Sequence, residues 1–152
     1  MIMNKKKLLV AVDFSLPSIQ ALETALNLCE QLNGTLHIVY IADMGDKKLS
    51  AAEVEENSSI EARVLKDFIH QLEVLAEKMS NGRTVFTTEV GYGDASAGIL
   101  RAAAKINADI MIMGTHGRTG IEHLLVGSVA ESVLKKATIP LICVRAKDKA
   151  TT

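Results

Sequence analysis

The stretch DIMIMGTHGRTGIEHLLVGSVAESVLKKATIPLICV, residues 109–144, decides the fold of this chain. It opens with an apolar run of strand length (109–113), passes through a connection with four glycines, and continues into a helical pattern and a second apolar run (140–144). Two strands joined through a helix pair in parallel, with a right-handed crossover. The same alternation along the rest of the chain predicts an α/β fold.

Three further apolar runs have the length of strands: LLVAV (8–12), LHIVYIA (36–42) and TVFTTEV (84–90). The first run of the chain and the last two are almost continuously apolar, as expected where helices cover both faces of a sheet. The run at 84–90 is more polar, which favours an edge strand. Pro140 has no N–H to donate, which favours the start of a strand or an edge. The pattern predicts one doubly wound, five-stranded parallel sheet with helices on both faces.

Four helical patterns separate the strands. Ser15 is placed to cap the first and Gly34 follows its end; the third begins near Asp94, and the fourth begins at Gly127–Ser128. The second is long, with an apolar residue at every third or fourth position from Ile60 to Met79. The polar residues 43–59 before it are predicted to form a variable loop with an early helical turn. No Pro-rich or Gly/Ser-rich linker divides the chain, so a single domain over residues 1–152 is expected.

Composition and charge exclude several classes of protein. The chain has 17 basic and 18 acidic residues and a net charge of −1, which argues against nucleic acid as a partner. The first apolar run is too short for a signal peptide and no run is long enough to cross a membrane, so we expect a cytoplasmic protein with no membrane partner. Cys29 and Cys143 lie among apolar neighbours, which predicts two buried, reduced thiols, with a disulfide as the alternative. No metal site is expected, because no Cys/His cluster has the required spacing.

The glycine-rich connection is longer than a plain strand-to-helix link, which needs about two to six residues. Gly114 follows a buried strand, where a side chain would obstruct a ligand, and Gly117 can adopt a positive φ. Gly127–Ser128 opens a helix, where unpaired N–H groups and the helix dipole favour an anion. A phosphate chain is therefore predicted between Gly114 and the N–H groups of Ser128 and Val129. The alternative is a flexible surface loop whose last glycine only caps a helix.

Two other phosphate-binding patterns are absent from the sequence. There is no GxxxxGK[ST] sequence, and no GxGxxG follows the first strand, so a Walker A loop is excluded and an NAD site is disfavoured. Asp13 ends the first apolar run. If the first and fourth strands are neighbours, this carboxylate and the glycine connection face one crevice at the carboxyl ends of the strands.

The chain resembles the nucleotide-binding universal stress proteins. The segment GTHGRTGIEHLLVGS matches that family's pattern G-x2-G-x9-G-[S/T], and VAVDFS, LHIVYIAD, ADIMIMG and SVAESVLKKATIPLICVR extend the resemblance over the chain apart from 43–59. The resemblance implies a Rossmann-like sheet in the order 3-2-1-4-5, similar to that of the adenine nucleotide alpha hydrolases. It also implies ATP, with or without Mg²⁺, at the first and fourth strand ends, and a homodimer through the fifth strand (140–145). The apolar character of that strand favours the same dimer, and the alternative is that residues 145–152 or a helix cover this edge.

The resemblance also assigns binding roles to individual residues. Asp13 resembles the acid that contacts the adenosine part, and Ile41 resembles the apolar residue beside the adenine. The full predicted nucleotide set is Val12, Asp13, Ile41, Met113, Gly114, Gly117, Arg118, Gly127, Ser128 and Val129. Phe14 stands where many relatives have a small residue; it either packs on the first helix or narrows the mouth of the pocket.

Two functions remain open at this level. The first is an ATP-binding regulatory module of the stress response, acting on an unknown protein partner. The alternative is a slow ATPase or autophosphorylating enzyme using the same site. Hydrolysis needs an oriented water and a charge clamp on the γ-phosphate. The sequence offers no convincing general base and no clear Mg²⁺ carboxylate, which favours binding with little or no turnover. His37 and His70 show no partner pattern and are expected to be packing or surface residues; His116 is expected to be structural or exposed.

Overall fold

The strands form one parallel sheet in the order β3-β2-β1-β4-β5. This computed structural model describes residues 4–42, 51–116 and 126–147, with residues 51–61 described by their backbone alone. The strands are β1 (Lys7–Ala11), β2 (Thr35–Ala42), β3 (Phe86–Tyr92), β4 (Ile110–Gly114) and β5 (Leu141–Val144). The helices are α1 (Leu16–Gln31), α2 (Ala51–Ser80), α3 (Ala95–Ile106) and α4 (Ser128–Lys136). The order confirms the predicted doubly wound sheet.

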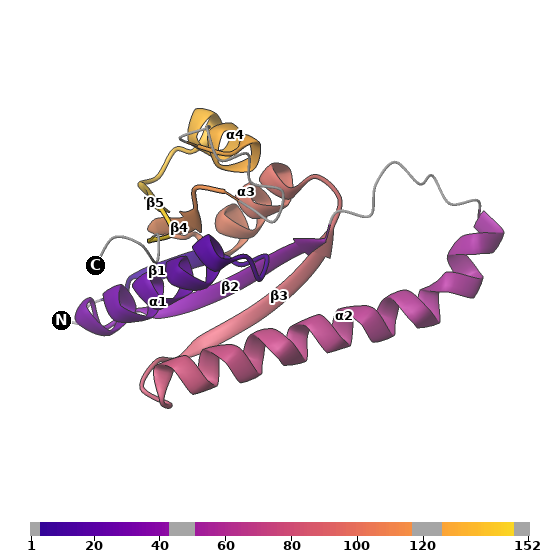
Figure 1. Cartoon of the computed structure of the whole chain (residues 1–152), viewed down its shortest axis with the longest axis horizontal. Coiled ribbons are helices and arrows are strands. Elements are labelled where there is room, and N and C mark those ends of the chain that lie inside the picture. Colours follow the sequence, from indigo (N-terminus) through magenta and orange to yellow (C-terminus); the bar gives the residue numbers. More distant parts are fainter. Residues whose placement is uncertain (1–3, 43–50, 117–125, 148–152) are drawn as a thin grey trace.

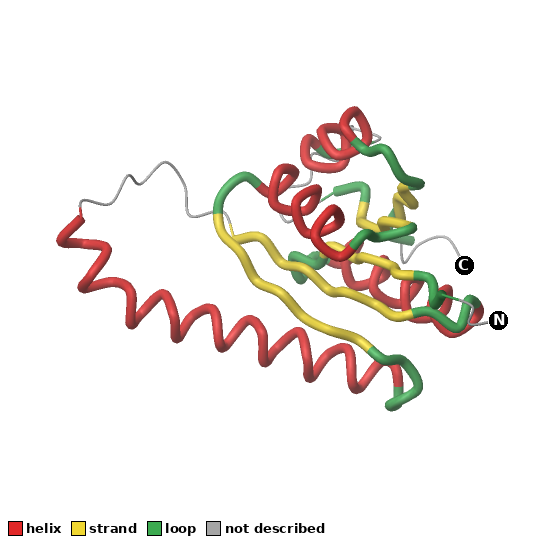
Figure 2. Tube along the Cα trace, turned by 180° about the vertical axis from the view of Figure 1, so that it is seen from behind, coloured by secondary structure: helices red, strands yellow, loops and turns green. Residues whose placement is uncertain are grey.

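Helices α1 and α2 cover one face of the sheet and α3 and α4 cover the other (Figure 1, Figure 2). The central strand β1 shows why. Leu8 and Val10 pack with the first pair of helices and Leu9 with the second, and none of the three has any exposed surface. Burying a side chain of this size stabilises the fold by about 1.5–3 kcal/mol. A strand that is apolar on both sides is therefore stable only between two layers of helices.

The edge strand β3 begins two residues later than the apolar run that predicted it. Its partners on β2 run from Leu36 opposite Phe86 to Ala42 opposite Tyr92. Val85, just before the strand, has 66% of its surface exposed. Its position confirms that the polar third strand lies at an edge of the sheet.

Helix α2 begins earlier than the apolar repeat indicated. It starts at Ala51, so residues 51–59 are helical where the sequence predicted a loop with only an early helical turn. This segment holds several Ala and Glu residues, which favour a helix even without an apolar repeat. Residues 43–50 lie outside the described part of the chain. In Figure 1, α2 runs alongside β3 and continues past the end of the sheet.

The two cysteines differ in environment. Cys29 on α1 is buried, and this burial raises the pKa of its thiol. Cys143 on β5 is exposed, so the prediction of a buried thiol there is wrong. Cys143 is exposed because β5 is an edge strand. On such a strand, apolar neighbours in the sequence do not ensure that a helix covers the side chain. Among the described residues, no helix combines the length and the apolar character that a membrane span requires.

Candidate functional site

The carboxyl ends of β1 and β4 lie side by side at the switch point of the sheet. From β1, the strand order runs to β2 and β3 on one side and to β4 and β5 on the other. Val10 pairs with Ile112, so residues 12 and 114 lie at the same level two positions further on. The first and fourth strands are therefore neighbours, as the predicted crevice requires. In open parallel sheets this position is where ligands bind.

The side chain of Asp13 is held by the start of α1. Its Oδ1 accepts hydrogen bonds from the backbone N–H of Ser15 (3.0 Å) and from the Ser15 hydroxyl (2.5 Å). The N–H of Asp13 donates to the Ser18 hydroxyl (3.2 Å), and the Ser15 hydroxyl accepts from the N–H of Ser18 (3.4 Å). The prediction that Ser15 caps α1 is confirmed. The same contacts fix the carboxylate of Asp13, half-buried, at the carboxyl edge of the sheet.

Phe14 directs its ring away from this turn and into the core. Its ring centroid lies 5.7 Å from that of Tyr40 on β2 and 6.0 Å from that of Phe68 on α2. Of the two roles considered for this residue, packing is therefore the one observed, although against β2 and α2 as well as beside α1. The backbone φ of Phe14 is 65°, in the left-handed region that bulky residues rarely adopt. Nothing in the sequence predicted this conformation.

The absence of a side chain at Gly114 allows the start of α1 to pack closely against the end of β4. A Cβ at this position would lie 2.8 Å from the Cβ of Pro17, 2.9 Å from its carbonyl carbon and 3.0 Å from the N of Ser18. The sequence explained the glycine by the approach of a ligand, but the close approach described here is that of the α1 backbone. Any side chain at residue 114 would push α1 away from β4.

Gly127 closes the base of the glycine-rich connection. Its N–H donates to the carbonyl of Thr115 at 2.5 Å, and a Cβ on Gly127 would lie 2.9 Å from that oxygen. Gly127 is also the N-cap residue of α4, and as a glycine it has no side chain with which to cap this helix end. Ser128 and Val129 in its first turn are exposed. The positive end of the α4 dipole is thus presented next to the end of β4, an arrangement that favours an anion.

The apolar members of the predicted set lie deeper. Val12 and Met113 are 1% and 6% exposed and pack into the cores on opposite faces of the sheet, so only their backbones can face a ligand. Ile41 is half-buried and lies level with Asp13, because Ala11 pairs with Val39. The Ile41 side chain packs against α3 at Gly98, where a Cβ would lie 2.7 Å from its Cδ1.

The structure therefore brings Asp13, Ile41, Gly114 and Gly127 to one edge of the sheet. Gly117 and Arg118 lie outside the described residues. Sequence reasoning missed Thr115, which is 7% exposed and whose hydroxyl lies 3.0 Å from Nδ1 of His116. Within the described ranges, no group of three or more His, Cys, Asp or Glu side chains is arranged to hold a metal ion.

Polar groups also gather where α3 begins. Asp94 caps α3, as predicted, by accepting a hydrogen bond from the N–H of Ala97 (2.8 Å). That hydrogen bond, together with the one from the Ser96 hydroxyl, lowers the pKa of the Asp94 carboxyl. Ser132 on α4 donates in turn to the hydroxyl of Ser96 (3.0 Å), which ties the two helices together. The sequence pattern did not indicate this link, because it depends on the packing of α4 against α3.

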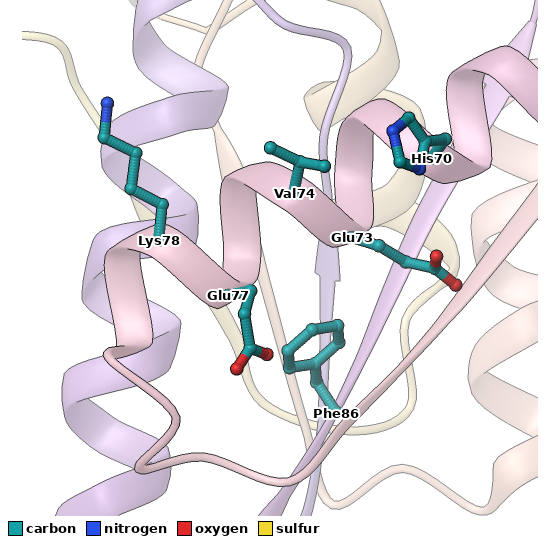
Figure 3. A pocket seen from close by; sticks show the side chains of 6 residues that line it. All are labelled: His70, Glu73, Val74, Glu77, Lys78 and Phe86. Carbon is teal, nitrogen blue, oxygen red and sulfur yellow. The ribbon is translucent and has the colours of Figure 1, made fainter.

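A separate groove lies between α2 and β3. Figure 3 shows Glu77 extending from α2 beside the ring of Phe86, the first residue of β3, while Glu73 points away from that ring. His70, Val74 and Lys78 of α2 complete the lining. Because Phe86 begins its strand, the groove lies at the amino end of β3, away from the carboxyl ends of β1 and β4 that Asp13 and Gly127 follow. It is not part of the candidate site.

Comparisons with known proteins agree with this fold. The model of the universal stress protein family matches residues 4–145. A universal stress protein of Methanocaldococcus jannaschii is 30% identical over 145 residues, which cover 95% of this chain and 84% of the relative. The solved structure of universal stress protein UspA from Lactobacillus plantarum shares the fold with a TM-score of 0.74 at 23% identity, covering 95% of this chain and 100% of that one. The universal stress protein from Archaeoglobus fulgidus, solved in complex with dAMP, has a TM-score of 0.64 at 19% identity, covering 93% and 99%. The chain belongs to the universal stress protein family.

Proposed function

We propose that this protein is an ATP-binding regulatory module of the stress response, whose nucleotide state is sensed by a protein partner. The observation that carries the proposal is the meeting of two features at the β1/β4 switch point. One is the Asp13 carboxylate fixed by Ser15. The other is the N-terminus of α4, whose N-cap is a glycine and which is held beside β4 by the hydrogen bond from Gly127 to Thr115. A carboxylate suits hydroxyl donors, and a free helix N-terminus suits phosphate.

In the proposed complex each part of the nucleotide has its own contacts. The adenine lies beside Ile41, and the ribose hydroxyls donate to Asp13. The phosphates lie against the N–H groups of Ser128 and Val129, with the Ser128 hydroxyl as a further donor. Gly117 and Arg118 complete the phosphate contacts, by analogy with the family pattern, and Mg²⁺ accompanies the phosphates. Relatives solved with dAMP and with cAMP support an adenine nucleotide as the ligand class.

The proposal includes a cytoplasmic homodimer joined through residues 140–145. In the described chain, β5 is an edge strand, and Cys143 on it is exposed. Helix α4, the element that precedes β5 in the chain, exposes Leu134 (57%). An apolar edge strand left uncovered invites pairing with a second chain.

The test compares nucleotides and one pair of matched variants. Calorimetric titration should give a clearly higher affinity for ATP than for AMP, because only ATP reaches the α4 end with its outer phosphates. Asp13→Asn should weaken the binding of both nucleotides about tenfold or more, because it removes the charge of the acceptor. A hydrogen bond to a charged group is worth about 1.5–3 kcal/mol. Asp109→Asn is the control, because Asp109 precedes β4 at the opposite edge, where it accepts from the N–H of Lys7.

Equal affinity for ATP and AMP would contradict the phosphate contacts, and a loss of binding in Asp109→Asn as large as that in Asp13→Asn would contradict the location. Gly114→Val is not a suitable probe, because its side chain would collide with Pro17 whether or not a ligand binds there. Steady-state phosphate release above about 1 per second, the low end of ordinary enzyme rates, would favour the ATPase alternative.

A further inference from the structure

A hydroxyl, an imidazole and a carboxylate form a chain of two hydrogen bonds between the neighbouring strands β2 and β3. Nδ1 of His37 on β2 lies 2.7 Å from Oγ1 of Thr87 on β3, and Nε2 of the same ring lies 2.7 Å from Oε2 of Glu89. His37 and Thr87 are register partners, and Glu89 is two residues further along, so all three side chains share one face. The sequence predicted a packing or surface residue at position 37 and showed no partner pattern for it. The two polar contacts depend on the register between β2 and β3, which a single sequence does not specify.

The tautomer of the neutral imidazole follows from the state of Glu89. Burial acts to raise the pKa of Glu89, but the hydrogen bond from His37 and the charge of Lys105, whose Nζ lies 3.6 Å from Oε1, outweigh it and lower the pKa. An ionised carboxylate can only accept hydrogen bonds. Nε2 must therefore carry the proton of the neutral ring. Nδ1 is then an acceptor, and the Thr87 hydroxyl donates to it.

This order of donors is the one that a base needs in order to remove the hydroxyl proton. The His37 side chain is only 12% exposed, so the ring is held in place, while Thr87 is exposed to solvent. A nucleophilic hydroxyl in hydrogen-bond contact with a base that is itself oriented by a third group is the general arrangement of covalent catalysis. The candidate nucleotide site does not use any of these three residues.

We propose that Thr87 is a nucleophilic hydroxyl that accepts acyl groups from activated esters, with His37 as its general base and Glu89 as the positioning residue. In the first step a bond forms between Oγ1 of Thr87 and the acyl carbon, and the bond from that carbon to the alcohol oxygen breaks. The hydroxyl proton passes to Nδ1 of His37 and then to the departing alcohol or to solvent. Water attacks the acyl-Thr87 ester in a second step, with His37 again as base, and the carboxylic acid is released.

The expected substrate class is narrow. General-base catalysis alone contributes about 10²–10⁴-fold to a rate. Such an increase is enough for esters with good leaving groups, whereas ordinary esters and amides need further stabilisation of the oxyanion. The probe is accordingly p-nitrophenyl acetate.

The neighbouring threonine provides a matched control. Thr88 is the same residue type on the same strand, but its side chain faces the α2 side, where its hydroxyl lies 3.3 Å from Oε1 of Glu73 and is hydrogen-bonded to that carboxylate. It contacts no imidazole in the described structure. Any reactivity that came only from an exposed hydroxyl on this edge strand would be shared by the two threonines.

The experiment treats the full chain, without nucleotide, with p-nitrophenyl acetate and follows acetylation of each residue by peptide mass spectrometry. Thr87 should be acetylated and Thr88 should not. His37→Gln, which keeps a polar side chain of similar size, should slow acetylation of Thr87 about 100-fold. Thr87→Val should remove the acetylated peptide, and Thr88→Val should leave the rate unchanged.

Glu89→Gln separates positioning from a purely structural role. The Gln amide would donate to Nε2 and shift the ring proton to Nδ1, so the rate should fall while the chain stays folded by circular dichroism. The ¹⁵N chemical shifts of His37 should report the change of tautomer directly. The proposal is overturned if Thr87 is not acetylated, if Thr88 reacts as fast, or if neither His37→Gln nor Glu89→Gln changes the rate by more than about twofold.

Discussion

At the scale of single residues, Phe14 combines an unfavourable backbone conformation with close ring contacts beside the candidate site. It follows Asp13 directly, its φ is 65°, and its ring is enclosed by Tyr40 and Phe68. A non-glycine residue in this region stores about 1–3 kcal/mol of strain. The packing of the ring offsets this cost, and the turn that carries Asp13 is thereby tied to α2.

Two substitutions at Phe14 separate the energetic effect of the ring contacts from that of the backbone conformation. Phe14→Ala removes the ring contacts and keeps the unfavourable φ, and it should lower the free energy of unfolding by about 2–4 kcal/mol, near the lower part of the range for large aromatic truncations. Phe14→Gly loses the same contacts but adopts this φ without strain, so it should be about 1 kcal/mol more stable than the alanine variant. Urea unfolding measures both. An alanine variant as stable as the glycine variant would contradict the left-handed conformation.

Glu89 gives a pH dependence with a definite sign. Burial acts to raise its pKa, but His37 and Lys105 lower it below the ordinary value of 4.5. A carboxyl whose folded-state pKa is depressed contributes stability above its unfolded pKa and loses that contribution as pH falls through the folded value. The stability that the wild type has over Glu89→Gln should therefore be present above pH 4.5 and be lost as the pH falls below about 4.5. Thermal unfolding across this range measures the difference, and a difference that persisted undiminished far below pH 4.5 would contradict the assigned pairing.

At the scale of elements, α3 packs against β2 through a glycine. A Cβ at Gly98 would lie 2.7 Å from Cδ1 and 2.8 Å from Cγ1 of Ile41, the residue proposed to lie beside the adenine. The Ile41 side chain therefore contacts α3 and is also the side chain proposed to contact the adenine. The close approach explains why a helix interior holds a residue with poor helix propensity.

Gly98→Ala should show this coupling. Overpacking costs about 1–3 kcal/mol, and the better helix propensity of alanine returns about 1 kcal/mol, so a net destabilisation of up to about 2 kcal/mol is expected together with weaker nucleotide binding. Ile41→Val in the same chain should relieve part of the stability loss, which a double-mutant cycle measures. Strict additivity of the two substitutions would mean that the side chains do not meet.

The sequence predicted the elements well and their contacts poorly, for physical reasons. The number and kind of elements follow from the lengths of apolar runs, as in β1 and β4, because burial on two faces demands such runs. The start of α2 was missed because residues 51–59 are helical without an apolar repeat. The His37–Thr87 contact and the exposure of Cys143 depend on what lies across the strand, which a single sequence does not specify. The sequence predicted that the candidate site lies at the carboxyl ends of the strands. It did not predict that Gly114 is a glycine because the backbone of α1 approaches it closely.

At the scale of the whole molecule, the two edges of the sheet differ. β3 is flanked by α2, whereas β5 leaves Cys143 exposed. The carbonyls of Pro140 and Val144 accept from the N–H groups of Met111 on β4 and of Thr115 just after it. Because the backbone groups of a strand alternate in direction, those of Leu141 and Cys143 point to the open edge. This edge is the one proposed to join two copies of the chain.

Proline substitution tests that edge. Cys143→Pro removes an outward N–H and no bond within the sheet, so it should convert the proposed dimer to a monomer in sedimentation velocity while the chain stays folded. Ile142→Pro removes an inward group and should instead destabilise the fold. Cys143→Ser, which keeps the N–H, serves as the control and should remain dimeric. A wild-type chain that sediments as a monomer at micromolar concentration would exclude the proposed interface.

The pairing of β1 with β4 also sets the order in which the molecule can assemble. Leu8 lies beside Ile110, so the central strand meets its second neighbour only after most of the chain has left the ribosome. The half made of β1, β2 and β3 draws on the earlier part of the chain, whereas the crevice at Asp13 needs β4 and α4. Contacts between residues so far apart in sequence form slowly. During synthesis, one flank of β1 therefore stays open to chaperones or to another nascent chain until the last strands arrive.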